Sequence, residues 1–342
     1  MKIAVNFNRS RGPSGGGNGF LESLIRSLQS NNHEVYFDLN NKDLDLILIL
    51  DPRWNHQNAA FNSQNIVRYL KKVNENVIVV HRINECDERK GTKFMNKKLR
   101  AINYIADSTV YVGAWLKDLN LRNGNSRTDF DKVILNGSDK DIFNSKSFSP
   151  WAGDDPLKLV THHWSNNKMK GFDVYQRLDD LLSKDFWAKK FLFTYIGNLP
   201  KGLNLRNIIH VPPLYGLELA GEISKHHGYI TASINEPGGN HQNEGALCGL
   251  PLLYRDSGCM PEYCSGYGIP FNRDNLEAKL IEFHENYSSL VKLMPSYPHT
   301  ASVMTAQYLK HFDYLLQNKA KIISERNLKR NLINLYRLYF PI

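Results

Sequence analysis

Residues 235–251 read NEPGGNHQNEGALCGLP, and apolar strand-like segments flank this stretch at Gly228–Ile234 and Leu250–Tyr254. The pattern places Glu236 at the exit of a strand and Glu244 eight positions later, in the first turns of a helix. A strand, a turn and a helix followed by another strand are typical of a parallel sheet with crossover helices. We therefore predict an α/β fold.

The same stretch also predicts a binding site. In open α/β sheets, ligands lie beyond the carboxyl ends of the strands, and helix N-termini bind anions through their free amide hydrogens. A phosphate would rest on Gly238, Gly239 and Asn240, while the two glutamates would accept hydrogen bonds from sugar hydroxyls. We therefore expect this segment to recognise a nucleotide-sugar.

The length and composition indicate a globular protein of two domains. The chain of 342 residues is too long for one ordinary core, and its 42% hydrophobic and 23% charged residues are typical of globular proteins. The net charge of +9 favours anionic partners such as nucleotide phosphates, acidic lipid surfaces or nucleic acid. No RNA-recognition signature accompanies this charge, so we expect no nucleic-acid partner.

Other features predict a cytoplasmic location. No apolar run approaches the roughly 18 residues that a membrane-spanning helix needs, and the first residues enter a strand without a signal-peptide layout. The four cysteines, Cys86, Cys248, Cys259 and Cys264, show no C-x-x-C spacing. We expect reduced thiols, with a disulfide between Cys259 and Cys264 as the disfavoured alternative.

Strand-like and helix-like patches alternate in two series, which a polar stretch at 136–156 separates. We expect an N-terminal acceptor-side domain over 1–150, a nucleotide-sugar-binding domain over 151–318, and an amphipathic helix over 319–342 that packs back on a domain. Contact of that helix with a membrane surface is the alternative. Strands are expected at 2–7, 34–39, 44–50, 76–83, 109–112, 132–135, 157–162, 190–197, 208–211, 229–234 and 250–254, and helices at 20–28, 64–73, 97–106, 172–183, 217–226, 240–248 and 276–293.

Six motifs occur in an order that resembles the retaining glycosyltransferases of family 4, most strongly between Val133 and Phe271. The six motifs are the loop Gly15-Gly16-Gly17, His81 near a strand end, Asn136-Gly137-Ser138-Asp139 with Phe143, Lys170-Gly171, the E-x7-E pair Glu236 and Glu244, and Ser257-Gly258-Cys259-Met260-Pro261-Glu262. The resemblance implies the GT-B fold, in which two Rossmann-like domains with parallel sheets face an interdomain cleft. It also implies transfer of a sugar from a nucleotide-sugar with retention of anomeric configuration. The basic C-terminal segment and the net charge of +9 favour a glycan or lipid-linked acceptor.

The resemblance assigns roles to individual residues. It implies that His81 contacts the donor sugar near the reacting carbon, that Lys170 binds the diphosphate, and that Glu236 lies against the donor sugar. These three are the expected catalytic residues, and Asn84 and Glu85 are expected to contact the acceptor. The expected donor-binding residues are Gly16, Gly17, His163, Lys170, Pro237, Gly238, Gly239, Asn240 and Glu244. The ordinary alternatives are a structural histidine, a solvated lysine and exposed glutamates.

One departure concerns the position six residues before Lys170, where the family has an arginine and this chain has Trp164. His162, His163, Lys168 and Arg9 are candidates for the missing positive charge. The departure keeps open a non-catalytic protein that binds glycans or nucleotides. A nucleotide-sugar epimerase of the same fold is the other alternative.

We expect no metal site and no cofactor. Asp43-Leu44-Asp45 resembles a metal-binding Asp-x-Asp, but it precedes its apolar strand instead of following it. The pairs His162-His163 and His226-His227 are adjacent residues, which point to opposite faces of a strand and therefore do not share a metal. We also find no Ser-His-Asp arrangement.

Overall fold

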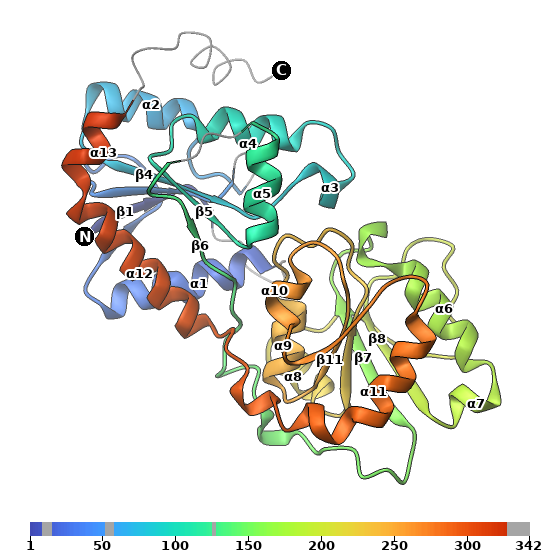
Figure 1. Cartoon of the computed structure of the whole chain (residues 1–342). Helices are drawn as coiled ribbons and strands as arrows, with labels where there is room; N and C mark the ends of the chain where they lie inside the picture. The colour runs from blue at the N-terminus through green and yellow to red at the C-terminus, as the bar shows by residue number, and fades with distance from the viewer. Residues whose placement is uncertain (9–15, 52–57, 125–127, 327–342) are drawn as a thin grey trace. The chain divides into compact units, whose positions relative to one another are not determined.

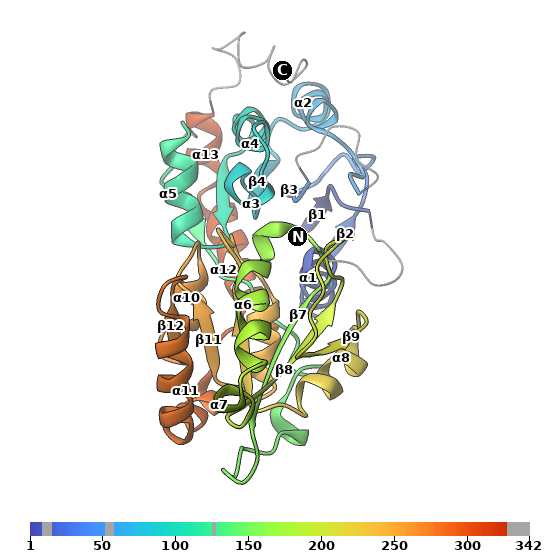
Figure 2. The same ribbon diagram turned by 90° about the vertical axis from the view of Figure 1, so that its right-hand side faces the viewer.

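A computed structural model describes residues 1–8, 16–51, 58–124 and 128–326 (Figures 1 and 2). The chain forms two compact units. One is built mainly from Met1 to Leu135 together with the chain from Met304 onward, and the other mainly from Asn136–Val303. Each unit has its own six-stranded sheet in which every strand pair is parallel.

The sheet of the first unit has the order β2-β1-β3-β4-β5-β6. Its strands are β1 (Lys2–Val5), β2 (Glu34–Tyr36), β3 (Leu46–Ile49), β4 (Ile78–Ile83), β5 (Ser108–Tyr111) and β6 (Lys132–Val133). Its helices are α1 (Gly16–Ser30), α2 (Ser63–Lys72), α3 (Asp87–Lys90), α4 (Met95–Asn103), α5 (Ala114–Arg122), most of α12 (Ala301–Gln317) and α13 (Lys319–Glu325). Every residue of β3, β4 and β5 is buried, as expected for parallel strands that helices cover on both faces.

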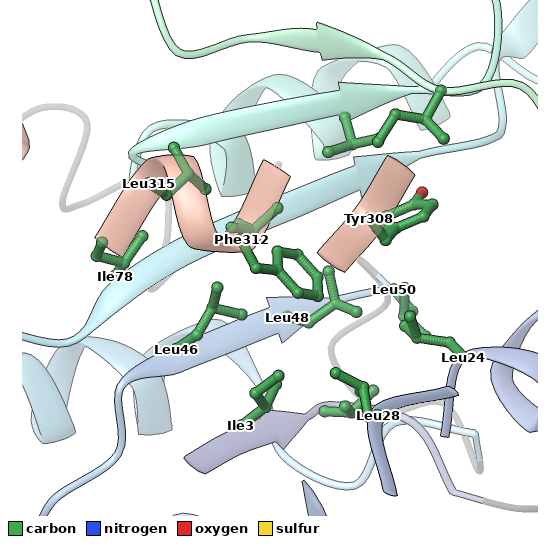
Figure 3. Packing of buried hydrophobic residues seen from close by; sticks show 14 of the residues in the cluster. Ile3, Leu24, Leu28, Leu46, Leu48, Leu50, Ile78, Tyr308, Phe312 and Leu315 are labelled. Atoms are coloured by element: carbon green, nitrogen blue, oxygen red, sulfur yellow. The ribbon is translucent and has the colours of Figure 1, made fainter. Parts of the chain in front are cut away.

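Two helices from opposite ends of the sequence cover one face of this sheet. Leu24 and Leu28 of α1 and Phe312 of α12 share a buried cluster with Leu46 and Leu48 of β3. Figure 3 shows the side chains of α12 pointing toward the strand residues. The other face packs against α2 through a second cluster. Burial of these apolar side chains stabilises the unit by about 1.5–3 kcal/mol for each large one.

The end of α13 is fixed to the first unit by a buried ion pair. The guanidinium of Arg326 donates to both carboxylate oxygens of Asp107, at 2.8 Å from Nε to Oδ1 and 2.6 Å from Nη2 to Oδ2. It also donates to the carbonyl oxygens of Glu75 and Val77, at 2.5 and 2.6 Å. The sequence predicted a helix over 319–342 that packs back on a domain. Its first part corresponds to α13, and residues 327–342 lie outside the described part of the chain.

The sheet of the second unit has the order β12-β11-β10-β7-β8-β9. Its strands are β7 (Leu157–His163), β8 (Phe191–Gly197), β9 (Ile209–Val211), β10 (Gly228–Thr231), β11 (Leu252–Arg255) and β12 (Gly268–Phe271). Its helices are α6 (Phe172–Leu182), α7 (Asp185–Ala188), α8 (Gly216–Ile223), α9 (His241–Leu247), α10 (Met260–Cys264) and α11 (Leu276–Val291), with short 3₁₀ turns η1 (Ser145–Ser147), η2 (Lys168–Lys170) and η3 (Met294–Ser296). Helices α6 and α11 pack together against one face of the sheet (Figure 2).

The unit boundaries differ from the expected boundaries at 150 and 318. The chain joins the second unit already at Asn136, because its backbone N–H donates to the Tyr263 hydroxyl at 2.8 Å. The chain returns to the first unit at Met304, because the apolar face of α12 completes the core of that unit. The polar stretch at 136–156 is therefore largely part of the second unit.

No helix in the described ranges is long and apolar enough to cross a membrane. The structure joins none of the four cysteines in a disulfide, and all four are buried. Burial raises the pKa of the Cys86 and Cys248 thiols to about 12, which keeps these two groups protonated and unreactive at neutral pH.

Candidate functional site

The stretch that predicted the fold forms the expected strand, turn and helix. Strand β10 ends at Thr231, and α9 begins at His241. Glu236 lies in the intervening turn with 5% of its surface exposed, and its carbonyl oxygen accepts from the backbone N–H of Cys259 at 2.8 Å. Pro237 is also buried, whereas Gly238, Gly239 and Asn240 are partly exposed.

Lys170 and Glu236 form an ion pair beside this turn. Lys170 Nζ lies 3.2 Å from Glu236 Oε2, and the exposed fractions of the two side chains are 14% and 7%. Each of these largely buried charges stabilises the other, because burying an isolated charge costs a large desolvation free energy. The structure thus brings together two of the three residues that were expected to be catalytic.

Gly171 explains why a glycine must follow Lys170. Its φ is +82°, in the left-handed region that favours glycine. A Cβ atom at this position would lie 2.0 Å from the carbonyl oxygen of Ala232. The backbone N–H of Ile234 also donates to the carbonyl oxygen of Met169 at 2.8 Å. Close backbone approach therefore holds Lys170 against the turn that carries Glu236.

Glu244 lies on α9 and forms a short hydrogen bond with a histidine. Its Oε2 is 2.6 Å from Nε2 of His162, the penultimate residue of β7. The other ring nitrogen of His162 is 3.0 Å from the hydroxyl of Tyr229 on the neighbouring strand β10. His162 was a candidate for the missing charge near a diphosphate. Instead, the structure directs it to Glu244, one of the expected donor-binding residues.

His163 points to the opposite face of β7. Its ring nitrogen Nε2 is 2.7 Å from the hydroxyl of Tyr175 on α6, and only 3% of the residue is exposed. Its ring centroid also lies 4.9 Å from that of His241, the first residue of α9, and contact of His163 with the donor stays a prediction. The alternation of side chains along a strand accounts for the different fates of the two neighbouring histidines.

Asn136 fixes the glycine turn from a distant part of the sequence. Its side-chain Nδ2 donates to the carbonyl oxygen of Gly238 at 2.6 Å, and its own carbonyl oxygen accepts from Asn243 at 3.1 Å. Asn243 in turn accepts from the Tyr297 hydroxyl at 2.7 Å. The motif at 136–139 was noted in the sequence, but no local signal indicated that it supports a turn about 100 residues later.

Replacing Asn136 with alanine should lower the free energy of unfolding by about 1 kcal/mol, the usual net value of one such hydrogen bond. Chemical denaturation measures this change. Asn144→Ala is the control, because its side chain makes local bonds: Nδ2 donates to the Lys140 carbonyl oxygen at 3.2 Å and Oδ1 accepts from the Lys146 backbone N–H at 3.3 Å. Equal stability of the two variants would show that the bond to Gly238 holds nothing in place.

The structure buries His81 inside the first unit. It lies in the interior of β4 with no exposed surface, and its Nδ1 is 3.4 Å from Nδ2 of Asn103 on α4. Burial lowers the pKa of His81 to about 3. Its Nε2 is buried and has no hydrogen-bond partner among the described residues, and contact of His81 with a donor sugar stays a prediction. β4 ends at Ile83, as the sequence predicted, and His81 lies two positions before that end.

Asn84 and Glu85, the predicted acceptor residues, occupy more open positions in the first unit. Asn84 and Glu85 follow β4 and are partly exposed, and Glu85 forms an ion pair with Lys90 at 3.0 Å. Gly16 and Gly17 are the first residues of α1. Asn84 and Glu85 keep the accessibility that contact with an acceptor requires.

Burial of His81 predicts a pH dependence of stability. The unfolded chain binds a proton at this residue below about pH 6.5, whereas the folded chain does not do so until about pH 3. The unfolded state therefore binds more protons between these values, and stability falls as the pH decreases. His81→Gln should reduce the slope of unfolding free energy between pH 4 and 6 by about 1.4 kcal/mol per pH unit. Urea unfolding across this range measures the slope, and an unchanged slope would contradict the burial.

Trp164 is 49% exposed at the position where an arginine was expected. Lys168 is also exposed, and Arg9 lies outside the described residues. Within the described part of the chain, no group of three or more metal-ligating side chains comes together.

The chain resembles solved glycosyltransferases in structure, although its sequence is far from theirs. The sequence matches no protein-family model and no curated protein sequence. A glycosyltransferase from Rickettsia africae is similar in structure, with a TM-score of 0.64, 14% identity, and coverage of 93% of this chain and 98% of that chain.

Two further solved structures were crystallised with nucleotides. The catalytic domain of starch synthase IV from Arabidopsis thaliana, bound to ADP and acarbose, has a TM-score of 0.65 and 9% identity, with 92% of this chain and 99% of that chain covered. Anabaena HepE in complex with UDP-glucose has a TM-score of 0.56 and 15% identity, with 95% and 99% covered. At such identities the likeness shows the fold alone. The predicted fold class is confirmed: the chain has the α/β GT-B fold of glycosyltransferases.

Proposed function

We propose that this protein is a glycosyltransferase that moves a sugar from a nucleotide-sugar donor to a glycan or lipid-linked acceptor. The observation that carries the proposal is the joint placement of Lys170, Glu236 and Glu244 beyond the carboxyl ends of the adjacent strands β7 and β10. Ligands of open α/β sheets bind at such ends. The similarity to glycosyltransferases with bound ADP or UDP-glucose supports a nucleotide-sugar donor.

The Lys170–Glu236 pair suits the departure of a diphosphate. An ammonium group has three N–H donors, so Lys170 can keep its bond to Glu236 and still donate to a phosphate oxygen. Charge-assisted bonds of this kind are the strong ones, and they strengthen as negative charge develops on the leaving group. Glu236 would then orient the sugar, and the partly exposed backbone of Gly238, Gly239 and Asn240 would face the phosphates.

We infer retention of configuration from the family resemblance. In this route the acceptor attacks from the face of the leaving group, and the departing phosphate takes up the acceptor proton. The alternative double displacement needs a carboxylate nucleophile with a second carboxyl group about 5 Å away. The carboxylate of Glu236 is already held by a lysine, which favours an orienting role over a nucleophilic one. Catalysis would then rest on positioning and electrostatic stabilisation without a metal ion.

A thermal-shift screen against UDP-, GDP-, ADP- and CMP-sugars tests the proposal, because a ligand that binds only the folded state raises the unfolding temperature. A donor found in this way is then incubated with the protein alone and with candidate acceptors. Transfer to an acceptor supports a glycosyltransferase. Binding without transfer or hydrolysis would favour the non-catalytic alternative, for which the exposed Trp164 is the motivating observation, and formation of an epimer would favour an epimerase.

We also propose that the first unit contacts anionic lipid at the face that carries α4. Lys93, Lys97 and Arg100 are exposed there, and Phe94 is 47% exposed with Lys98 Nζ 4.8 Å from its ring centroid. Basic side chains around an aromatic ring are suited to an acidic membrane surface. A lipid-linked acceptor would be presented at such a surface.

Reversing two of these charges, Lys93→Glu with Lys97→Glu, should reduce binding to phosphatidylglycerol vesicles on the order of tenfold or more, since each basic residue contributes about 1 kcal/mol near an anionic surface. Sedimentation with vesicles measures the bound fraction. Lys184→Glu with Lys189→Glu, at two exposed lysines of the second unit, is the control with the same change in net charge. Equal binding of both variants would contradict a specific role of the α4 face.

A further inference from the structure

Three side chains from three elements of the second unit form a continuous hydrogen-bonded series. Tyr229 of β10 contacts His162 of β7, and His162 contacts Glu244 of α9, at 3.0 and 2.6 Å. The exposed fraction is 11% for the His162 side chain and 18% for that of Glu244. Tyr229 is fully buried. The series therefore runs from the core of the unit to a partly exposed carboxylate.

The donors and acceptors in this series can be assigned. The carboxylate of Glu244 only accepts hydrogen bonds, so Nε2 of His162 must carry the proton between them. The Tyr229 hydroxyl accepts from the backbone N–H of His162 at 3.2 Å, which leaves its own proton to point toward Nδ1. Burial raises the pKa of Tyr229 well above its usual value, so the phenol keeps that proton. The tyrosine thus selects the tautomer in which His162 donates to Glu244.

The arrangement restricts the Glu244 carboxylate to one orientation. Oε2 is occupied by His162, whereas Oε1 accepts no hydrogen bond from any residue within the described ranges. The ring of Tyr229 also sets how closely α9 approaches β10, because a Cβ atom at Gly245 would lie 2.3 Å from Tyr229 Cδ2. One oxygen is held by the protein, and the other remains available to a ligand hydroxyl.

We propose that His162 and Tyr229 are positioning residues that orient Glu244 toward a ribose hydroxyl of the nucleotide, and that they thereby determine preference for ribonucleotides over 2′-deoxyribonucleotides. The inference rests on the proposed nucleotide-sugar site and adds two residues to it. A carboxylate of fixed orientation accepts a hydrogen bond from a hydroxyl group without first losing side-chain conformational entropy, which makes the bond more favourable. A loose carboxylate would bind water as readily as ribose.

The test compares the affinities of paired nucleotides by calorimetry on the full chain. The probes are UDP, ADP and GDP, each with its 2′-deoxy counterpart. A charge-assisted hydrogen bond to the 2′-hydroxyl predicts that the wild type prefers the ribonucleotide it binds best on the order of tenfold. Tyr229→Phe removes one hydroxyl and keeps the ring, and His162→Leu removes the donor to Glu244. Both should bring the preference close to unity.

Two further variants separate positioning from folding. His162→Gln retains an N–H donor of similar reach and should keep part of the preference, even if Tyr229→Phe does not fold. Tyr287→Phe is the matched control, since Tyr287 is equally buried and its hydroxyl accepts from the backbone N–H of Trp151 at 3.1 Å, on the α11 side of the core. It should keep the full preference.

The outcomes distinguish this inference from the proposed function. Loss of the preference in Glu244→Ala, but not in His162→Leu or Tyr229→Phe, would overturn the positioning role and leave the nucleotide site intact. An unchanged preference in Glu244→Ala would overturn the role of Glu244 in both proposals. Loss in His162→Leu and Tyr229→Phe with retention in Tyr287→Phe is the expected result.

Discussion

Replacing Lys170 with alanine is expected to lower the turnover number on the order of a hundredfold or more, the usual effect of removing one group that stabilises developing charge. The ammonium of Lys170 lies 3.2 Å from Glu236 and is mostly shielded from water, so its charge acts at low screening. Because the leaving diphosphate gains charge only as the sugar departs, turnover should fall more than donor affinity does. Steady-state kinetics with varied donor separates the two effects.

The variant also leaves Glu236 without its cation, so stability has to be measured beside activity. Lys170→Ala with Glu236→Gln removes both charges, so a recovery of stability in this double variant shows how much of the stability lost in Lys170→Ala comes from the unpaired carboxylate. Lys189→Ala, at a lysine whose side chain is 74% exposed, is the control for removal of a surface charge. Near-normal turnover in a folded Lys170→Ala protein would remove the lysine from the mechanism.

Replacing Arg326 with alanine is expected to destabilise the first unit by about 3–5 kcal/mol, the usual consequence of breaking a buried ion pair from one side. Asp107 has only 3% of its side chain exposed. Burial raises the pKa of this carboxyl group, while Arg326 lowers it. Without the guanidinium, the carboxyl group would either be protonated or remain a buried charge with an unfavourable desolvation free energy. Denaturant unfolding of the full chain measures the loss.

Two further variants identify the origin of that loss. Asp107→Asn removes the negative charge, so Arg326→Ala should be less harmful in that background. Lys321→Ala alters an exposed lysine of the same helix, which is paired with Glu325 at 3.9 Å, and should change stability by less than about 0.5 kcal/mol. A loss equally small for Arg326→Ala would mean that α13 is not held by this pair.

Much of the fold follows from the hydrophobic pattern. Continuous apolar segments such as Leu46–Ile49 predicted buried parallel strands, and the alternation with helical patches predicted crossover connections. Six of the described strands and helices were not predicted, namely β12, α3, α5, α7, α10 and α12. Strand β12 contains Pro270, which argues against a strand except at a sheet edge, where β12 lies. Helices α5 and α12 were also missed, although Met304, Tyr308, Phe312 and Leu315 recur at helical spacing on α12.

The parts of the site that local sequence determines could be predicted, whereas the parts that depend on residues distant in sequence could not. The strand, turn and helix around Glu236 and Glu244 could be predicted from the sequence, because local glycines and a fixed spacing define them. The partners of these residues were not, since they come from strands that pair only after folding. Glu244 contacts His162 82 positions away, and Asn136 supports Gly238 from 102 positions away. The burial of His81 did not follow from the strand end, since β4 ends at Ile83 as predicted; it depends on packing with residues distant in sequence, such as Asn103 of α4.

Calorimetric titration of UDP-, GDP-, ADP- and CMP-sugars into the wild type and Glu244→Ala tests the nucleotide-sugar site most directly. We expect the wild type to bind at least one of the four donors and the alanine variant to bind the same donor on the order of tenfold more weakly or worse. Failure of the wild type to bind any of them, or equal binding by the two proteins, would contradict the proposed nucleotide-sugar site.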